Sequence, residues 1–187
     1  MKRQSLWGIL ILSILLASVV SPALAQNRLA VEAGGLLPFS SFGDVNDASP
    51  YFGATFDIQD VNPLGQVALL GVFLRAAYAP LVVDKDLKSA LEGAGRETGS
   101  SYFEGVLGLK AHSKASPFFL SVDAGYANYN LPGGSSKSGV ASGVGLGTAF
   151  GGPAVNLTVE ARMNVAFMSG MDNLQFLTLT ASLGFPF

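Results

Sequence analysis

The stretch that decides the fold is Leu174 to Phe187, which reads LQFLTLTASLGFPF. From Leu177 onward, apolar residues alternate with small polar residues and glycine. Successive side chains of a β-strand point to opposite faces, so this alternation predicts a strand with one apolar and one polar face. The apolar face carries Leu177, Leu179, Ala181, Leu183, Phe185 and Phe187.

The same alternation recurs seven more times, which gives eight predicted strands. They cover residues 28–37, 51–59, 67–79, 101–111, 118–130, 140–150, 155–167 and 174–187. Long polar connections alternate with short turns, and the longest connection, 80–99, contains a charged piece that we expect to form a short helical turn. An even number of strands allows the first and last to pair and close the sheet.

Composition indicates that this sheet lies in a membrane. Charged residues make up 13% of the chain, against about 25% in ordinary soluble domains, and the mean hydropathy is +0.42. After residue 25, no apolar run reaches the ~20 residues of a membrane-spanning helix. Lipid accepts only helices and closed barrels, because both satisfy every backbone hydrogen bond internally. The predicted fold class is all-β: an eight-stranded antiparallel up-and-down transmembrane β-barrel.

The first 25 residues have the three parts of a secretory signal. Lys2 and Arg3 precede an apolar run over 6–20, and Ala23-Leu24-Ala25 forms a cleavage site. We therefore expect a cleaved signal peptide, 1–25, and a barrel domain, 26–187. A retained single-span anchor is the alternative, but the apolar run is about 15 residues, shorter than a span requires.

Charge and cysteine content exclude several classes of function. Loss of Lys2 and Arg3 with the signal lowers the number of Lys and Arg from 11 to 9, against 13 Asp and Glu, so the net charge becomes −4. This acidic balance argues against nucleic acid as a partner. The absence of cysteine excludes disulfides, thiolate nucleophiles and Cys-ligated metals.

Aromatic residues on the apolar face fall at two heights. Near the long connections lie Phe52, Tyr78, Phe103, Tyr126 and Phe167; near the short turns lie Phe118, Phe150, Phe185 and Phe187. Two aromatic girdles around an aliphatic band match the two interfaces of a membrane. They predict the bacterial outer membrane, with the long loops extracellular and both termini periplasmic.

Charged residues on the opposite face predict a polar interior. Arg75 lies in a nearly all-apolar segment, and it should face inward because an Arg toward lipid costs about 2–4 kcal/mol. The inward-facing ionisable residues are Glu32, Asp57, Arg75, Glu104, Lys110, Asp123, Glu160 and Arg162. An eight-stranded interior is filled by side chains, so these charges need partners.

We expect Arg75, Lys110 and Arg162 each to bridge carboxylates in a network that plugs the barrel. Glycines at every second position over 143–147 should leave room for these side chains. A narrow ion path through the same residues is the alternative.

Three parts of the chain resemble a known family. They are the signal ending Ala23-Leu24-Ala25, the segment AGGLLPFSSFGDVNDASPYFGATFDI (33–58) and the strand ending at Phe187. Over 26–187 the chain is similar to the eight-stranded outer-membrane β-barrels of the OmpA/OmpX type, in the outer membrane protein β-barrel domain family. The resemblance implies architecture rather than activity.

Two features depart from that family. No peptidoglycan-binding domain follows the barrel in this sequence, so cell-wall tethering is not implied. Pro186 lacks a backbone N–H group, so fraying of the last pair is expected.

No catalytic, cofactor or metal site is predicted. The glycines of 143–147 lie within a strand with no helix after it, unlike a phosphate-binding loop. His112, the only histidine, is expected to be a solvated turn residue rather than part of a Ser-His hydrolase. The loop aspartates lack the spacing of an EF-hand.

The favoured function is a small outer-membrane barrel with a structural or surface-interaction role through its loops. Expected partners are outer-membrane lipid, an extracellular ligand or partner, and the barrel assembly machinery, which would read Leu183, Phe185 and Phe187 as an assembly signal. A monomer is expected.

Two further alternatives to this function are a lipid A-modifying barrel enzyme and a soluble lipocalin-type barrel. The enzyme needs a catalytic cluster at the extracellular rim, and His112 is expected at the opposite end. The soluble barrel needs its aliphatic face inside.

Overall fold

The computed structural model describes residues 27–59, 68–113, 115–151 and 154–187. The predicted signal peptide lies outside these residues, so its cleavage stays a prediction. Eight long strands build the structure: β1 (Arg28–Phe39), β3 (Ser49–Gln59), β4 (Ala68–Val83), β5 (Ser100–Ser113), β6 (Phe118–Asn130), β7 (Ser136–Gly151), β8 (Asn156–Met168) and β9 (Leu174–Pro186). Three short elements are α2 (Ser40–Gly43), β2 (Asn46–Asp47) and α3 (Lys85–Gly93). No helix in the described part of the chain is long and apolar enough to cross a membrane.

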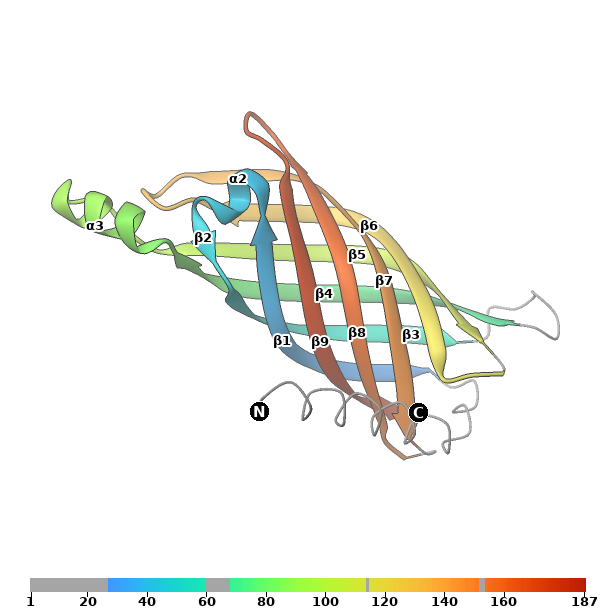
Figure 1. Cartoon of the computed structure of the whole chain (residues 1–187). Coiled ribbons are helices and arrows are strands. Elements are labelled where there is room, and N and C mark those ends of the chain that lie inside the picture. Colours follow the sequence, from blue (N-terminus) through green and yellow to red (C-terminus); the bar gives the residue numbers. More distant parts are fainter. Residues whose placement is uncertain (1–26, 60–67, 114, 152–153) are drawn as a thin grey trace, which may run out of the picture.

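The long strands form a closed antiparallel barrel, which confirms the predicted fold class. Each long strand pairs with its neighbours in the chain, and β1 also pairs with β9 from Arg28–Pro186 to Phe39–Gln175. Figure 1 shows the strands tilted around a common axis. The expected fraying at Pro186 is wrong, because the Phe187 N–H group donates to the Asn27 carbonyl at 3.0 Å and continues the ladder.

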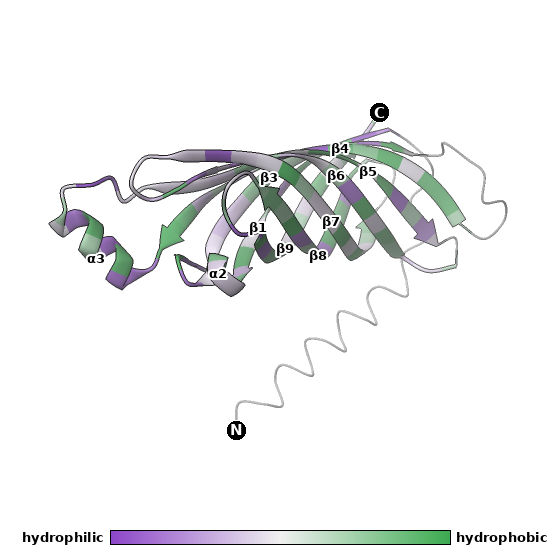
Figure 2. Ribbon diagram, turned by 90° about the horizontal axis from the view of Figure 1, so that it is seen from above, coloured by the Kyte–Doolittle hydropathy of each residue, from purple (hydrophilic) through white to green (hydrophobic). Residues whose placement is uncertain are grey.

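The outer face of the barrel is apolar. Leu107 and Val144 are each 60% exposed, and apolar side chains are exposed on all eight long strands. Tyr78 faces Phe52 on one side and Phe103 on the other, so three of the aromatics near the long loops lie side by side. Hydrophobic residues recur along every strand in Figure 2. A water-soluble barrel would not expose such a belt, so the lipocalin-type alternative, which needs the aliphatic face inside, is wrong.

One end of the barrel, the loop end, carries the short elements. The loop between β1 and β3 holds α2 and β2, and β2 pairs with the last residues of β4. The helix α3 follows β4 and is capped by Asp84, whose carboxylate accepts from the N–H groups of Asp86 and Leu87. The strands are longer than the pattern predicted, since β4 reaches Val83 and β7 begins at Ser136.

The interior at the loop end is filled by an aromatic plug, here defined as Phe42, Tyr51, Tyr102, Tyr129 and Phe176. Tyr102 and Phe42 meet Phe176 edge-on at centroid distances of 5.0 and 5.9 Å, and Phe42 meets Tyr129 at 5.5 Å. Edge-to-face contacts of this kind stabilise beyond the area they bury. The plug therefore closes the lumen on the side of the long loops.

The apolar belt leads to a prediction about depth in the bilayer. Leu107, at mid-height on β5, should tolerate arginine poorly: Leu107→Arg should lower the free energy of unfolding by about 2–4 kcal/mol. Val155, exposed just before β8, lies at the turn end, so Val155→Arg should cost about 0–1 kcal/mol. Denaturant unfolding in lipid vesicles, followed by heat-dependent gel mobility, measures both. Equal losses for the two variants would contradict the assigned belt.

Candidate functional site

The candidate site is the polar layer inside the barrel, below the aromatic plug. The structure places all eight predicted residues there, and each is at most 7% exposed: Glu32, Asp57, Arg75, Glu104, Lys110, Asp123, Glu160 and Arg162. Arg28, which sequence reasoning missed, lies beside them with 4% exposure. These nine residues are called the polar layer below.

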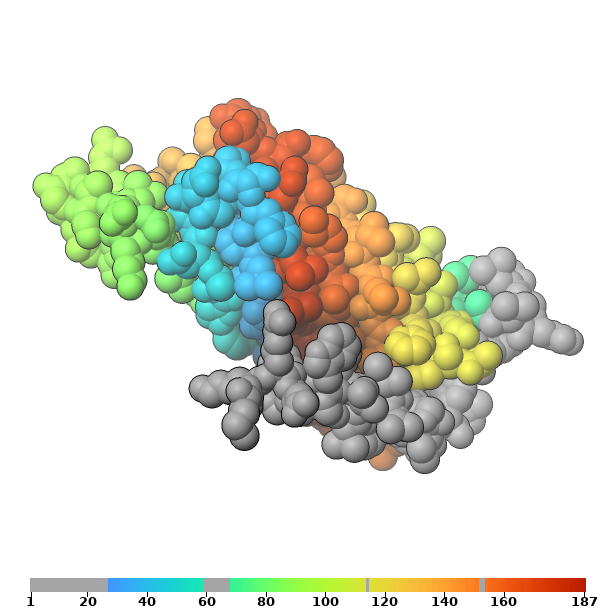
Figure 3. Space-filling model, in the orientation of Figure 1, coloured from blue at the N-terminus to red at the C-terminus, as the bar shows by residue number. Residues whose placement is uncertain are grey.

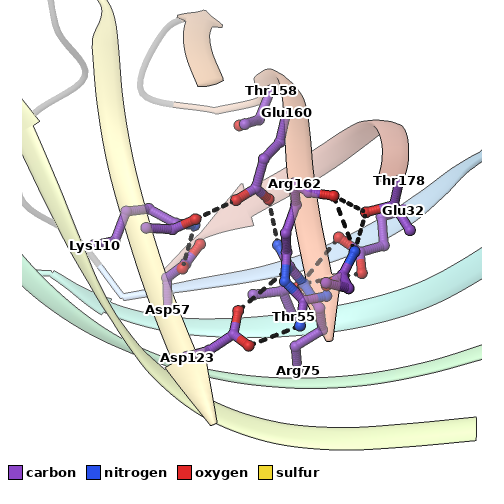
Figure 4. A network of polar contacts seen from close by, with 12 residues as sticks. Glu32, Thr55, Asp57, Arg75, Lys110, Asp123, Thr158, Glu160, Arg162 and Thr178 are labelled. Carbon is purple, nitrogen blue, oxygen red and sulfur yellow. Dashed lines mark hydrogen bonds and ion pairs between the residues drawn. The ribbon is translucent and has the colours of Figure 1, made fainter. Parts of the chain in front are cut away.

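Arg75 occupies the centre of the polar layer. From β4 its guanidinium pairs with Glu160 on β8, with Glu32 on β1 at 3.2 Å, and with Asp123 on β6 at 3.9 Å. Figure 4 shows these side chains converging from different walls. One cation therefore ties β4 to three other strands across the lumen.

Arg162 connects the polar layer to the aromatic plug. Its two terminal nitrogens contact Glu104 Oε1 at 2.5 Å and Asp123 Oδ1 at 2.7 Å. The hydroxyl groups of Tyr51 and Tyr102 donate to Glu104 at 2.9 and 3.0 Å. Glu104 is fully buried, yet three donors satisfy its carboxylate. Sequence reasoning assigned no role to these tyrosines.

A third cluster lies toward the turn end. The Asp57 carboxylate accepts from Arg28 Nε at 2.9 Å and from Lys110 Nζ at 2.9 Å. Lys110 also lies over the rings of Phe73 and Phe119, 5.0 and 5.1 Å from their centroids. Among the ion pairs of the described residues, Lys110 meets only Asp57, so the expected bridge between two carboxylates is replaced by one carboxylate shared with Arg28.

The glycines of β7 make the layer possible. A Cβ atom at Gly143 would collide with the Arg162 guanidinium, and one at Gly145 would collide with the carboxylate of Glu160 and the hydroxyl of Ser121. A Cβ at Gly147 would collide with the ring of Phe119. Strand β7 therefore contributes empty volume, into which longer side chains from β6 and β8 extend.

The expectation that His112 is a solvated turn residue is wrong, because His112 lies within β5 and is partly buried. Strand β5 continues to Ser113, so His112 still lies in the sheet, paired with Phe119. The imidazole is partly buried, with its centroid 5.3 Å from the Phe119 ring. It lies at the turn end, across the barrel from the long loops.

Paired charges and buried rings fill the described interior of the barrel. Four cations and five carboxylates fill the described interior, which leaves one negative charge in excess among the nine residues. The aromatic plug covers this layer at the loop end. The residues predicted as an assembly signal, Leu183, Phe185 and Phe187, lie instead on the outer face and are exposed.

The class of protein is now defined. A closed antiparallel barrel of eight strands, with a lipid-facing apolar belt and a filled interior, has the fold of the eight-stranded outer-membrane β-barrels of the OmpA/OmpX type. The chain crosses the bacterial outer membrane with its strands.

Comparison with solved structures agrees on the fold. Neisserial surface protein A (NspA) superposes with a TM-score of 0.53 and 15% identity, covering 86% of this chain and 97% of that one. The N-terminal β-barrel domain of Pseudomonas aeruginosa OprF superposes with a TM-score of 0.51 and 13% identity, covering 86% of this chain and 98% of that one. Ail, the attachment invasion locus protein of Yersinia pestis, superposes with a TM-score of 0.50 and 13% identity, covering 87% of this chain and 100% of that one. The sequence matches no protein-family model and no curated protein.

The polar layer leads to a second prediction. Arg162→Ala leaves the buried carboxylates of Glu104 and Asp123 without their guanidinium partner, which should lower the free energy of unfolding by about 3–5 kcal/mol. Arg96→Ala removes an exposed arginine beyond α3 and should change it by less than about 0.5 kcal/mol. Denaturation midpoints of the refolded variants measure the difference, and matching midpoints would refute a stabilising role for the layer.

Proposed function

We propose that this barrel is a rigid outer-membrane scaffold whose role is surface interaction through its long loops. The observation that carries the proposal is the contrast between the two halves of the molecule. The interior is filled by paired charges and by the aromatic plug, whereas the loop end carries folded elements with exposed side chains. Function tends to lie on loops that a rigid scaffold holds in place.

The helix α3 is the most prominent of these elements. None of its residues is buried, and it projects from the loop end in Figure 3. The segment after it is held by the loop between β6 and β7, because Gly133 N–H donates to the Glu97 carbonyl at 2.8 Å. This helix therefore presents an ordered surface, which suits recognition of an extracellular partner.

The alternatives have less support. An ion path would have to pass both the aromatic plug and the ion pairs of Arg75 and Arg162. A lipid A-modifying activity needs acid-base or nucleophilic groups near the outer leaflet, whereas His112 lies at the turn end. The loop-display role requires neither an open lumen nor a reactive cluster.

Replacement of α3 tests the proposal. A variant in which a short Gly-Asn-Gly turn replaces residues 85–98 should lose adhesion to host cells or to other bacteria, because the displayed surface is gone. Asp47→Asn changes an exposed residue of a different loop and should retain adhesion. Adhesion is compared at equal surface amounts of each barrel. Full adhesion by the loop replacement would remove the support for display through α3.

We also propose that the barrel is a monomer that reaches the membrane through the assembly machinery. Closure of β1 on β9 leaves no free strand edge along the barrel wall, which favours a monomer. The C-terminal end of the chain presents Leu183, Phe185 and Phe187 on the outer face of the barrel. There the assembly machinery could bind them before β1 pairs with β9.

The terminal residue gives a direct test of this assembly signal. Phe187→Ser should reduce the amount of folded barrel in the outer membrane, while refolding of the purified variant in detergent should be little changed. Phe118→Ser alters another exposed aromatic at the turn end and should assemble normally. Heat-dependent gel mobility measures both, and normal assembly of Phe187→Ser would count against the signal.

A further inference from the structure

A pocket of about 400 Å³ opens at the loop end, outside the aromatic plug. Three loops meet there, those between β1 and β3, β6 and β7, and β8 and β9; Figure 1 shows α2 beside the start of β9. The lining residues are Ser41, Phe42, Val45, Tyr129, Leu131, Met171, Asp172 and Leu174. A volume of this size lies within the range of small-molecule sites.

The floor of this pocket is rigid. Phe42 and Tyr129 are each 2% exposed and meet edge-on, so their rings are fixed by the plug beneath them. Asn46 fixes them further, because its amide nitrogen donates to the Tyr129 hydroxyl at 3.0 Å and to the Phe42 carbonyl at 3.4 Å. A preformed floor lowers the entropic cost of binding.

The lining of the pocket contains one charged side chain, that of Asp172. The three surrounding loops, 40–48, 131–135 and 169–173, contain Asp44, Asp47 and Asp172 and no lysine or arginine. Among the described residues, none of the three aspartates forms a salt bridge with a basic side chain, and Asp172 itself lines the pocket. Two basic residues lie beside these loops: Lys137 Nζ would come 3.8 Å from a Cβ added at Gly170, and Arg96 Nη1 would come 4.0 Å from one added at Gly133. Neither of them lines the pocket.

We propose that this pocket binds a small organic cation with an apolar body, such as an aromatic or aliphatic ammonium compound. The apolar body would pack against Val45, Leu131 and Met171, the apolar lining residues that are partly exposed. The ammonium group would lie near Asp172, because a carboxylate attracts such a cation. A neutral molecule would make only the apolar contacts, and an anion would be repelled by the Asp172 carboxylate.

This inference goes beyond the loop-display role and does not depend on it. Adhesion through α3 and binding in the pocket use different parts of the loop end, so either can fail alone. Asp172 is exposed and lies outside the polar layer, so changing it should leave folding intact.

The test uses the mature barrel in an uncharged maltoside detergent and isotope-labelled methionine methyl groups observed by NMR. Met171 lines the pocket, whereas Met163 is exposed on the lipid-facing wall and reports non-specific partitioning. Benzyltrimethylammonium should shift the Met171 signal and not that of Met163. It should bind about two- to fivefold more tightly than benzyl alcohol, and phenylacetate should bind most weakly.

Two variants complete the test. Asp172→Asn should remove the preference for the cation over benzyl alcohol while retaining the binding of benzyl alcohol. Asp47→Asn, at an exposed acid that does not line the pocket, should bind the cation within about twofold of the unmodified barrel. Equal affinities for the three probes, an undiminished preference in Asp172→Asn, or equal shifts at Met163 and Met171 would each overturn the proposal.

Discussion

The pairing of β1 with β9 is the constraint on which the rest of the structure depends. In hydrocarbon an unpaired backbone N–H or C=O group costs several kcal/mol, so a sheet can cross a membrane only when it has no free edge. Closure with eight strands then fixes the diameter, and at this diameter the lumen holds side chains and little else. The apolar belt, the filled interior and the exclusion of wide pores all follow from that closure.

Charged side chains in the interior are removed from water, so each of them needs a partner of opposite charge, and the polar layer provides these partners. Ion pairs out of water gain little net stability, because desolvation offsets much of the attraction between the charges. These ion pairs do, however, specify the register in which neighbouring strands pair. Moving β4 by one residue would turn Arg75 toward lipid and separate it from Glu32 and Glu160. The glycines of β7 make these ion pairs possible, because they leave room for the Arg162 and Glu160 side chains to extend into the lumen.

The sequence predicts the barrel well because parity along a strand is a strong signal. Once Arg75 is placed inward, the same alternation orients every charged residue of the polar layer. Arg28 shares the parity of Glu32, so the same rule applied to the first residue of β1 would have found it. The strand ends were less predictable, because β5 continues past the predicted end at Ala111 and carries His112 into the sheet.

The aromatic plug could not be read from the sequence. Tyr51, Tyr102 and Phe176 have the inward parity, but a tyrosine or phenylalanine at a strand end is equally consistent with a membrane girdle. Phe42 lies in a loop that has no periodicity. Only the folded chain shows these rings meeting at one height.

Phe42 links the sealing of the barrel to recognition at its mouth. The turn from β1 into α2 places Ser40 at a φ of 50°, a left-handed conformation that is unfavourable for any residue except glycine. Burial of the Phe42 ring against Tyr129 and Phe176 offsets that strain and holds α2 over the lumen. The same ring is the floor of the loop-end pocket, so the pocket keeps its shape whatever residues occupy its rim. A site built in this way can change its ligand through rim residues such as Asp172 without disturbing the membrane-spanning barrel.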